Sequence, residues 1–249
     1  MTRGRLLPEF GLTVTHRYPF DLRFANGALA TPDAWDQLRG ADPAFGLGGS
    51  REEWLRRAAS FPALASQAAQ IVALLRGWGV TRMVSVGVGT AILEYHIQTQ
   101  YPELTLRCGD YAPASLELLR RCFTECRSIE VMDLLDTRWV RDPENEVVLL
   151  NRVDTELTDE QWRRVFSDLH RQRVRRIILI PCGLLTPRAL ARELQTIVRS
   201  ALRRRPLTKA GYFRTHARMR QLFSPGFRRT GVYHAGELPI WVLEVLEKA

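Results

Sequence analysis

Two glycines with one residue between them, Gly87 and Gly89, follow a run of β-branched residues and precede an apolar helical pattern. Glycine permits a tight turn and lets a ligand approach the backbone closely. In doubly wound folds such a turn lies outside the carboxyl ends of the strands, where ligands bind. The pattern alone is weak evidence, because a tight strand-to-helix turn without a ligand produces it as well.

Acidic residues follow the next two predicted strands. Asp110 ends the segment 104–110, and Asp133 comes directly after the strand at 129–132. A carboxylate at the first place can accept hydrogen bonds from both hydroxyls of a ribose. The alternatives are a turn residue ahead of Pro113 for Asp110 and a helix N-cap for Asp133. Two acids at successive strand ends favour a nucleoside site. Because Asp110 lies before the start of a helix, we expect its replacement to change folding stability far less than ligand affinity.

Two further acids, Asp154 and Glu156, come just after the fourth predicted strand and are the candidate catalytic residues. A carboxylate at this edge of the sheet can take a proton from a hydroxyl or amine substrate. The alternative is a pair of solvated loop acids. His16 and His216 are weaker candidates, since each stands alone in the sequence.

The cysteine spacing predicts no metal site. The sequence contains no CxxC pair and no cysteine at a short zinc-type spacing from a histidine. Cys122 and Cys126 would share one face of an uninterrupted helix. We therefore expect reduced thiols at the four cysteines, Cys108, Cys122, Cys126 and Cys182.

A dinucleotide cofactor is disfavoured. Dinucleotide folds need a third glycine to pack the helix against the strand, and Ile92 stands at the corresponding position. No tyrosine lies four residues before Lys209 or Lys248, so the tyrosine and lysine of a short-chain dehydrogenase are missing. Hydride transfer is therefore a minor interpretation.

The formal net charge of +9 favours an anionic partner such as nucleic acid. Only two of the 36 basic residues are lysines, however, so much of the charge reflects a general preference for arginine. The segment 199–220 has no acid and contains Tyr212 and Phe213, a pattern that can follow a phosphate backbone and stack bases. We expect a small-molecule substrate, with nucleic acid as the alternative.

Alternating strands and helices from residue 82 onward predict an α/β, doubly wound fold with a mostly parallel sheet. After a long helix at 190–198, two strands separated by the short turn AGE must pair antiparallel. The sheet is therefore expected to have seven strands, of which only the last runs against the others. These strands are expected at 83–88, 104–108, 129–132, 147–150, 176–180, 227–234 and 238–246.

Residues 1–60 differ from the rest, with aromatic residues and Gly/Pro-rich stretches but little periodicity. We expect residues 1–60 to form a cap segment, the first fifty of which cover the crevice, and residues 61–249 to form the sheet domain. The alternative is that the first fifty residues pack on the back of the sheet or mediate dimerisation. Ser50 and Glu53 make a capping-box pattern that begins a helix at Arg51. The sequence shows no signal peptide and no apolar run of membrane-spanning length, which favours a soluble, cytoplasmic protein without membrane contact.

Together these motifs resemble class I S-adenosylmethionine-dependent methyltransferases, over about three quarters of the chain from residue 64. SVGVGTA, at 85–91, is similar to the first motif of that family, and GDYAPASLELLRR, from Gly109, is similar to its second segment. VVLLNRVDTELTDEQW, from Val147, resembles the fourth-strand segment that faces the reacting methyl group. The resemblance implies a Rossmann-like methyltransferase fold, S-adenosylmethionine (SAM) as cofactor, and methyl transfer.

The resemblance also implies site residues. The glycine turn accommodates the methionine portion of the cofactor, Asp110 binds the ribose, and Asp133 lies beside the adenine amino group. The implied cofactor-binding residues are Ser85, Gly87, Gly89, Asp110, Tyr111, Asp133, Leu134 and Asn151. Asp154 and Glu156 remain the catalytic candidates, and no metal is implied.

Three residues depart from the family pattern. Ser85 replaces the usual acid, Ala91 replaces the third glycine, and Ala112 is a poor N-cap where the family prefers serine. Two alternatives therefore stay open beside a small-molecule methyltransferase. One is a catalytically silent, methyltransferase-like binding module, and the other is an RNA methyltransferase.

Overall fold

A computed structural model of the chain describes three continuous stretches, residues 46–187, 211–235 and 238–246, and the strand Thr13–His16. Single positions are described at Pro32, Asp33, Asp36, Ala191, Leu194, Gln195, Val198 and Leu202. Most of the predicted cap and most of the predicted helix at 190–198 lie outside the described residues.

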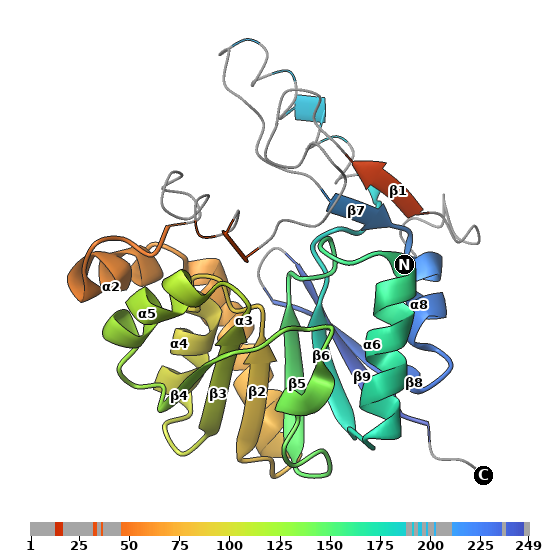
Figure 1. The fold of residues 1–249 in the computed structure, drawn as a ribbon, viewed down its shortest axis with the longest axis horizontal. Helices are drawn as coiled ribbons and strands as arrows, with labels where there is room; N and C mark the ends of the chain where they lie inside the picture. Colours follow the sequence, from red (N-terminus) through yellow and green to blue (C-terminus); the bar gives the residue numbers. More distant parts are fainter. Residues whose placement is uncertain are drawn as a thin grey trace.

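Seven strands form one sheet in the order β4-β3-β2-β5-β6-β9-β8 (Figure 1). The strands are β2 (Arg82–Val86), β3 (Thr105–Asp110), β4 (Ser128–Val131), β5 (Glu146–Asn151), β6 (Arg176–Ile180), β8 (Phe227–His234) and β9 (Pro239–Val245). The first five pair in parallel, while β9 lies antiparallel between β6 and β8. The predicted sheet and its terminal hairpin are confirmed: β6 and β8 have the predicted bounds, and the ends of the other strands differ by one or two residues.

Helices cover both faces of the sheet (Figure 1). One face carries α2 (Arg51–Ala59), α3 (Pro62–Gly77), α4 (Ile92–Gln100) and α5 (Pro113–Cys122). The other face carries α6 (Asp159–Arg171) and α8 (His216–Phe223). Successive residues of a strand point to opposite faces of the sheet. Met83 packs in the hydrophobic core on the α2–α5 face, and Val84 packs in the core on the α6 and α8 face. Burial on both faces explains why these strands read as nearly continuous apolar runs.

Two helices begin as the sequence predicts. Thr158 and Gln161 form the capping box of α6, in which each side chain binds the backbone of the other. The Ser50 side chain accepts a hydrogen bond from Glu53 N at 3.2 Å at the start of α2. The Glu53 carboxylate accepts from Gly49 N at 2.8 Å, one residue earlier than a standard capping box requires.

The start of α5 is capped by a residue from the distant N-terminal segment. Its N-cap residue, Ala112, makes no side-chain hydrogen bond. Instead the carboxylate of Asp36 accepts from Ala114 N at 3.2 Å and from Ser115 N at 2.9 Å. Asp36 therefore supplies the acceptor that Ala112 lacks, and it joins the predicted cap to the sheet domain.

The helix α5 ends earlier than its apolar spacing suggests. The N–H of Phe123, its C-cap residue, donates to Leu119 O at 2.7 Å. Cys126 lies in the following loop, so the expectation that it shares a helix face with Cys122 is wrong. All four cysteines are free thiols, and Cys182 is the one that is partly exposed.

A second, two-stranded sheet was not indicated by the sequence pattern. β1 (Thr13–His16) pairs antiparallel with β7 (Gly211–Arg214). Tyr212 N of β7 donates to the carbonyl of Thr155, in the loop after β5, at 2.9 Å. Figure 1 shows the pair above the edge of the sheet at which β5 and β6 end. The N-terminal segment therefore reaches the edge at which the crevice is predicted.

The helix α2 packs into the core of the sheet domain. The Trp54 side chain is fully buried, with ring centroids 5.1 Å from Tyr95 and 5.5 Å from Phe123. Arg51 forms an ion pair with Glu125 at 2.6 Å. These contacts associate α2 with the domain that follows it, and the boundary at residue 60 stays a prediction.

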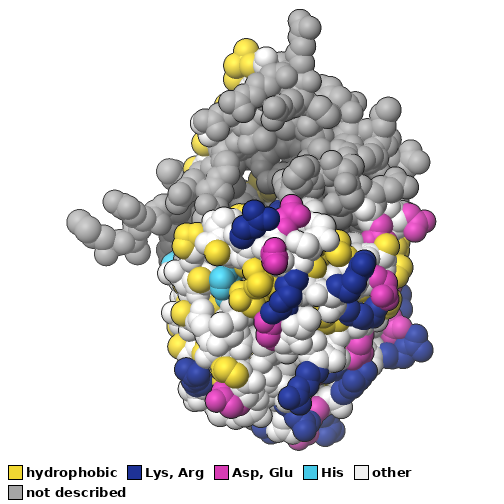
Figure 2. All heavy atoms as spheres, turned by 90° about the vertical axis from the view of Figure 1, so that its left-hand side faces the viewer, with side chains coloured by type: hydrophobic (Ala, Val, Ile, Leu, Met, Phe, Trp, Pro, Cys, Tyr) yellow, Lys and Arg dark blue, Asp and Glu magenta, His cyan; other side chains and the backbone are white. Residues whose placement is uncertain are grey.

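The described surface mixes both signs of charge. Figure 2 shows the face on the α2 and α5 side of Figure 1, where basic and acidic side chains are interspersed. The described part of this face therefore offers no continuous basic surface to a phosphate backbone. Among the described helices none is, by itself, long and apolar enough to cross a membrane, and α2 with α3 meets that test only when joined across an 81° bend.

Candidate functional site

The glycine turn joins β2 to α4 at the carboxyl edge of the sheet. Gly87 and Gly89 have φ values of +76° and +55°, and Ala91, at the N-cap of α4, has a φ of +51°. The N–H groups of Gly87 and Val88 donate to the carbonyl of Gly109 at 2.8 and 3.2 Å. Repeated left-handed conformations explain the glycines, and the two hydrogen bonds tie the turn to the end of β3.

Close packing between the turn and the loop after β5 also requires glycine at position 87. A Cβ atom there would lie 2.3 Å from Cγ1 of Val153, in the loop after β5. β2 and β5 are neighbours from which the chain continues to opposite sides of the sheet, and ligands bind at such switch points. Tight packing, the alternative to a ligand, therefore accounts for part of the glycine pattern.

Asp110, the last residue of β3, links the end of that strand to the glycine turn and to the start of α5. Its Oδ2 accepts from Gly89 N at 3.0 Å, and its Oδ1 accepts from Ala112 N at 3.1 Å. The residue is only 2% exposed. Its removal would take this acceptor from two backbone N–H groups, so the expectation of a small effect on folding is replaced by one of a clear cost.

Ser85, which stands where the family has an acid, is hydrogen-bonded to an acid from α4. Its Oγ donates to Oε1 of Glu94 at 2.8 Å, and both side chains are fully buried. Burial raises the pKa of Glu94 to about 7; the hydrogen bond from Ser85 opposes this increase and the charge of Asp110 adds to it. A carboxyl group is thus present beside position 85, contributed by a helix rather than by the strand.

Asn151, the last residue of β5, lies next to Glu94 and is partly exposed. Its side chain lowers the pKa of Glu94, although less than burial raises it. Oδ1 of Asn151 and Oε2 of Glu94 are both buried without a hydrogen-bond partner. Because Val86 pairs with Leu150, Asn151 is level with Gly87, where the turn begins.

The other predicted cofactor-binding residues follow β3 and β4. Asp133 is exposed, and its Oδ1 accepts from Leu135 N at 2.9 Å, as in the predicted alternative of a local turn. Leu134 is partly exposed and packs against the core on the α6 side. Tyr111 is partly exposed and directly follows Asp110. Asp133 and Leu134 therefore lie one strand away from the network at the glycine turn.

Asp154 is 2% exposed, and its carboxylate binds backbone amides. Oδ1 accepts from Cys182 N and Oδ2 from Gly183 N, each at 2.8 Å. Burial raises the pKa of Asp154, and these two hydrogen bonds oppose the increase. Its main-chain carbonyl accepts from the guanidinium of Arg214. The residue holds the loops after β5 and β6 together, and its catalytic role stays a prediction.

The other proton-transfer candidates are more widely spread. Glu156 is partly exposed in the loop after β5, and Thr155 Oγ1 donates to its Oε1 at 3.4 Å. His216, in α8, lies with its ring centroid 5.4 Å from that of Trp241, and burial lowers its pKa. The side chain of His16 lies outside the described residues.

Part of the basic segment at 199–220 is engaged within the fold. Arg214 is 1% exposed and pairs with Asp159 at 2.6 Å, and Arg218 pairs with the other oxygen of Asp159 at 2.7 Å. Arg214 N also donates to Gly183 O at 2.8 Å. These contacts hold the β7 region against the loops that follow β5 and β6. Because both arginines are bonded within the protein, they support a nucleic-acid-binding role for the segment less than the sequence pattern suggested.

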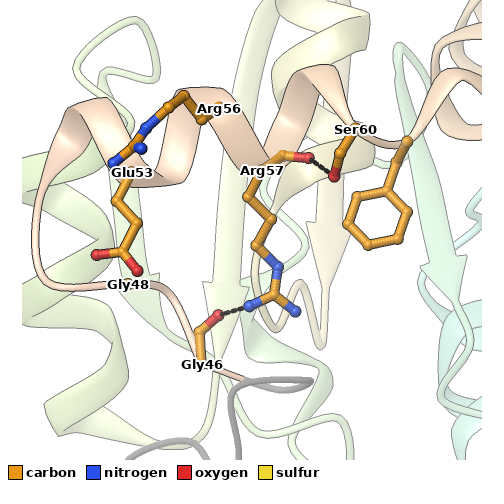
Figure 3. A pocket seen from close by; sticks show the side chains of 7 residues that line it. Gly46, Gly48, Glu53, Arg56, Arg57 and Ser60 are labelled. Atoms are coloured by element: carbon orange, nitrogen blue, oxygen red, sulfur yellow. Dashed lines mark hydrogen bonds between the residues drawn. The ribbon is translucent and has the colours of Figure 1, made fainter.

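A hollow of about 650 Å³ lies beside α2 (Figure 3). Arg57 crosses it to donate a hydrogen bond to the carbonyl of Gly46. The lining residues are Gly46, Gly48, Glu53, Arg56, Arg57, Ser60 and Phe61. None of them is a predicted site residue. Within the described part of the chain, no group of three or more His, Cys, Asp or Glu side chains is arranged to hold a metal ion.

Comparison with known proteins shows similarity in structure. No family model matches the sequence, and no curated protein matches it significantly. The mitomycin 7-O-methyltransferase MmcR has a TM-score of 0.59 and 18% identity, covering 90% of this chain and 65% of that one. Human N-acetylserotonin methyltransferase in complex with SAM has a TM-score of 0.55 and 16% identity, covering 86% and 56%. Magnesium protoporphyrin IX methyltransferase from Synechocystis PCC 6803, with bound SAH, has a TM-score of 0.52 and 16% identity, covering 74% and 84%.

These similarities confirm the predicted fold. The chain has a Rossmann-like sheet of the kind found in methyltransferases. It spans 65% of the length of the first of these proteins and 56% of the second. At identities of 16–18%, the substrates of these proteins do not transfer to this chain directly.

Sequence reasoning missed Glu94, although a signal for it exists. Helical spacing places Glu94 on the same face as Ile97 and Gln98, and all three are buried. An acid on the buried face of a helix needs a partner, and a serine in the preceding strand is a suitable one. The Asp36 cap had no such local signal, because it joins residues more than 75 positions apart.

Proposed function

We propose that this chain is a SAM-dependent methyltransferase that acts on a small-molecule acceptor. The observation that carries the proposal is the bonding at the carboxyl edge of the sheet, where the glycine turn after β2 is tied to Gly109 and Asp110. The three similar structures are all named as methyltransferases, and two of them contain SAM or S-adenosylhomocysteine (SAH).

The groups around the turn fit the nucleoside part of this cofactor. Asp110 offers a carboxylate, fixed by two backbone hydrogen bonds, as acceptor for the ribose hydroxyls. Tyr111 directly follows it and is partly exposed. We propose that Asp133 and Leu134, after the neighbouring β4, border the adenine.

The groups beneath the turn fit the amino-acid part. Gly87 and Gly89 keep the backbone free of side chains where the strand turns into α4. Ser85 and Asn151 both lie next to the buried Glu94, which supplies a carboxyl group at the switch point of the sheet. The residues present therefore provide acceptors for a ligand that carries an ammonium group and ribose hydroxyls.

The contribution of the chain to methyl transfer is mainly positioning. When bound, the cofactor supplies an electrophilic methyl group on a positively charged sulfur. Transfer from it is an in-line displacement, so holding the acceptor atom in line with that methyl group lowers the barrier. The carboxylate of Asp154 ties together the loops after β5 and β6, which lie at this edge.

A hydroxyl or amine acceptor must also lose a proton. We propose that Glu156, which is partly exposed, takes this proton, and that Asp154 contributes by fixing the same loop. Residues 1–60 are proposed to cap the acceptor, supported by two anchors at this edge, β1 on β7 and Asp36 at the start of α5. A cytoplasmic location remains a prediction.

A thermal-shift comparison of SAM, SAH and NAD tests the proposal. A ligand at one hundred times its dissociation constant stabilises the fold by about 2.7 kcal/mol, which raises the melting temperature of a chain of this size by roughly 5–10 °C. SAM and SAH should produce such a shift and NAD should not. A shift with NAD alone would indicate a different enzyme class, whereas binding of SAM without transfer to any acceptor would favour a silent binding module.

A further inference from the structure

Two buried oxygen atoms at the switch point of the sheet have no hydrogen-bond donor. One is Oε2 of Glu94, a side chain with 0% exposure, and the other is Oδ1 of the neighbouring Asn151. The second oxygen of Glu94 is satisfied, since it accepts from Ser85 Oγ at 2.8 Å. Leaving a buried acceptor without a donor costs free energy, so the ionised form of Glu94 favours a group that brings donors to both atoms.

The two oxygens lie under the glycine turn. Glu94 is the third residue of α4, immediately after the turn, and Ser85 is the last but one residue of β2. Asn151 ends β5 level with Gly87, and the residue as a whole is partly exposed. Asp110, which is proposed to hold the ribose, lies at the end of β3 on the other side of β2.

We propose that Glu94 and Asn151 together receive the α-ammonium group of the amino-acid part of SAM, and that Glu94 releases its proton to solvent as this group binds. The inference rests on the proposed function and assigns one part of its cofactor to two particular side chains. An ammonium group has three N–H donors, which suits two unpartnered acceptors. The sulfonium has no N–H or O–H to donate, so the ammonium end is the matching part of the ligand.

The charges around Glu94 explain the coupling to a proton. The ionisable groups that interact with it are Asp110 and Cys108 of β3 and Cys126 of the loop before β4. These groups are neutral or negative, and burial raises the pKa of Glu94 to about 7. Near neutral pH the side chain therefore carries a proton in about half of the molecules. An ammonium group brought beside it stabilises the carboxylate, so the proton leaves.

Calorimetric titration of the full chain with two ligands tests the proposal. SAH contains the amino-acid part, and 5′-methylthioadenosine contains the adenosine and the sulfur without it. Titration near pH 7 in two buffers with different heats of ionisation gives the number of protons released. SAH binding should release about half a proton per site, and its affinity should rise with pH up to about pH 8. Methylthioadenosine binding should release none and should not depend on pH in this range.

The variant Glu94→Gln has the shape of the protonated side chain but cannot lose a proton. It should weaken SAH binding roughly tenfold or more, remove the proton release, and leave the affinity for methylthioadenosine unchanged. Glu103→Gln, at an exposed glutamate in the loop after the same helix, is the matched control and should behave as wild type.

Three results would overturn the inference. The first is proton release that persists in Glu94→Gln, and the second is an equal loss of affinity for both ligands, which would indicate a purely structural role. The third is SAH binding by wild type that neither releases protons nor depends on pH, a result that needs no variant. If wild type binds neither ligand, the proposed function itself fails, and the inference fails with it.

Discussion

Replacing Glu94 by glutamine should change how folding stability depends on pH. Glu94 is fully buried, and burial raises its pKa from 4.5 to about 7. At about 1.36 kcal/mol for each pKa unit, this difference corresponds to roughly 3 kcal/mol of folding stability. Below pH 4.5 the folded and unfolded chains both carry the proton, whereas between pH 4.5 and about 7 only the folded chain keeps it. The stability of the wild type should therefore fall as the pH rises through this window.

Urea unfolding of the ligand-free protein measures this effect. Glutamine cannot ionise, so the variant should gain roughly 3 kcal/mol relative to wild type between about pH 4.5 and about pH 8. The exposed Glu103→Gln serves as control and should follow the wild-type profile. A difference between Glu94→Gln and wild type that stays constant over this pH range would refute the reasoning.

Three other substitutions test the site and the fold. Asp110→Ala should weaken SAH binding roughly ten- to a hundredfold and lower the unfolding free energy by about 2 kcal/mol, because two backbone N–H groups lose this acceptor; wild-type affinity in calorimetry would remove Asp110 from the site. Gly87→Ala should destabilise the fold by at least about 1 kcal/mol more than Gly79→Ala, since both have positive φ but only the first Cβ meets a side chain at 2.3 Å. Equal losses of unfolding free energy in Gly87→Ala and Gly79→Ala would show that the neighbouring side chain moves to accommodate the new methyl group without a cost in stability. Asp36→Ala should cost about 1 kcal/mol through loss of the α5 cap, with Asp33→Ala as control, and equal unfolding free energies would exclude the cap.

The sheet could be predicted from the sequence because its signals are local. Buried parallel strands are short apolar runs, and the AGE turn leaves the last two strands no other pairing than antiparallel. The end of α5 was predicted too late, because Cys126 continues the apolar spacing although the helix has already ended. The pairing of β1 with β7 had no local signal, since about 200 residues separate the two strands.

The positions of the candidate site residues were predictable where a strand end determines them. Gly89 and Asp110 fall at neighbouring strand ends, and the structure joins them by a hydrogen bond at 3.0 Å. The burial of the acidic side chains at the site could not be predicted from the sequence. Asp154 was expected as a loop acid near the substrate, yet its carboxylate is enclosed and bound to two amides. Ser85 was noted as a departure, while the carboxyl group that accompanies it, that of Glu94, became visible only through packing.

The structure of the chain in complex with SAH, with the stoichiometry established by calorimetry, shows whether the cofactor binds at the glycine turn. We expect one ligand at the turn between β2 and α4. Its ribose hydroxyls should lie within hydrogen-bond distance of the Asp110 carboxylate, and its ammonium group should lie beside Glu94 and Asn151. A ligand bound elsewhere, such as in the hollow beside α2, or a wild-type chain that binds NAD and not SAH, would contradict this expectation.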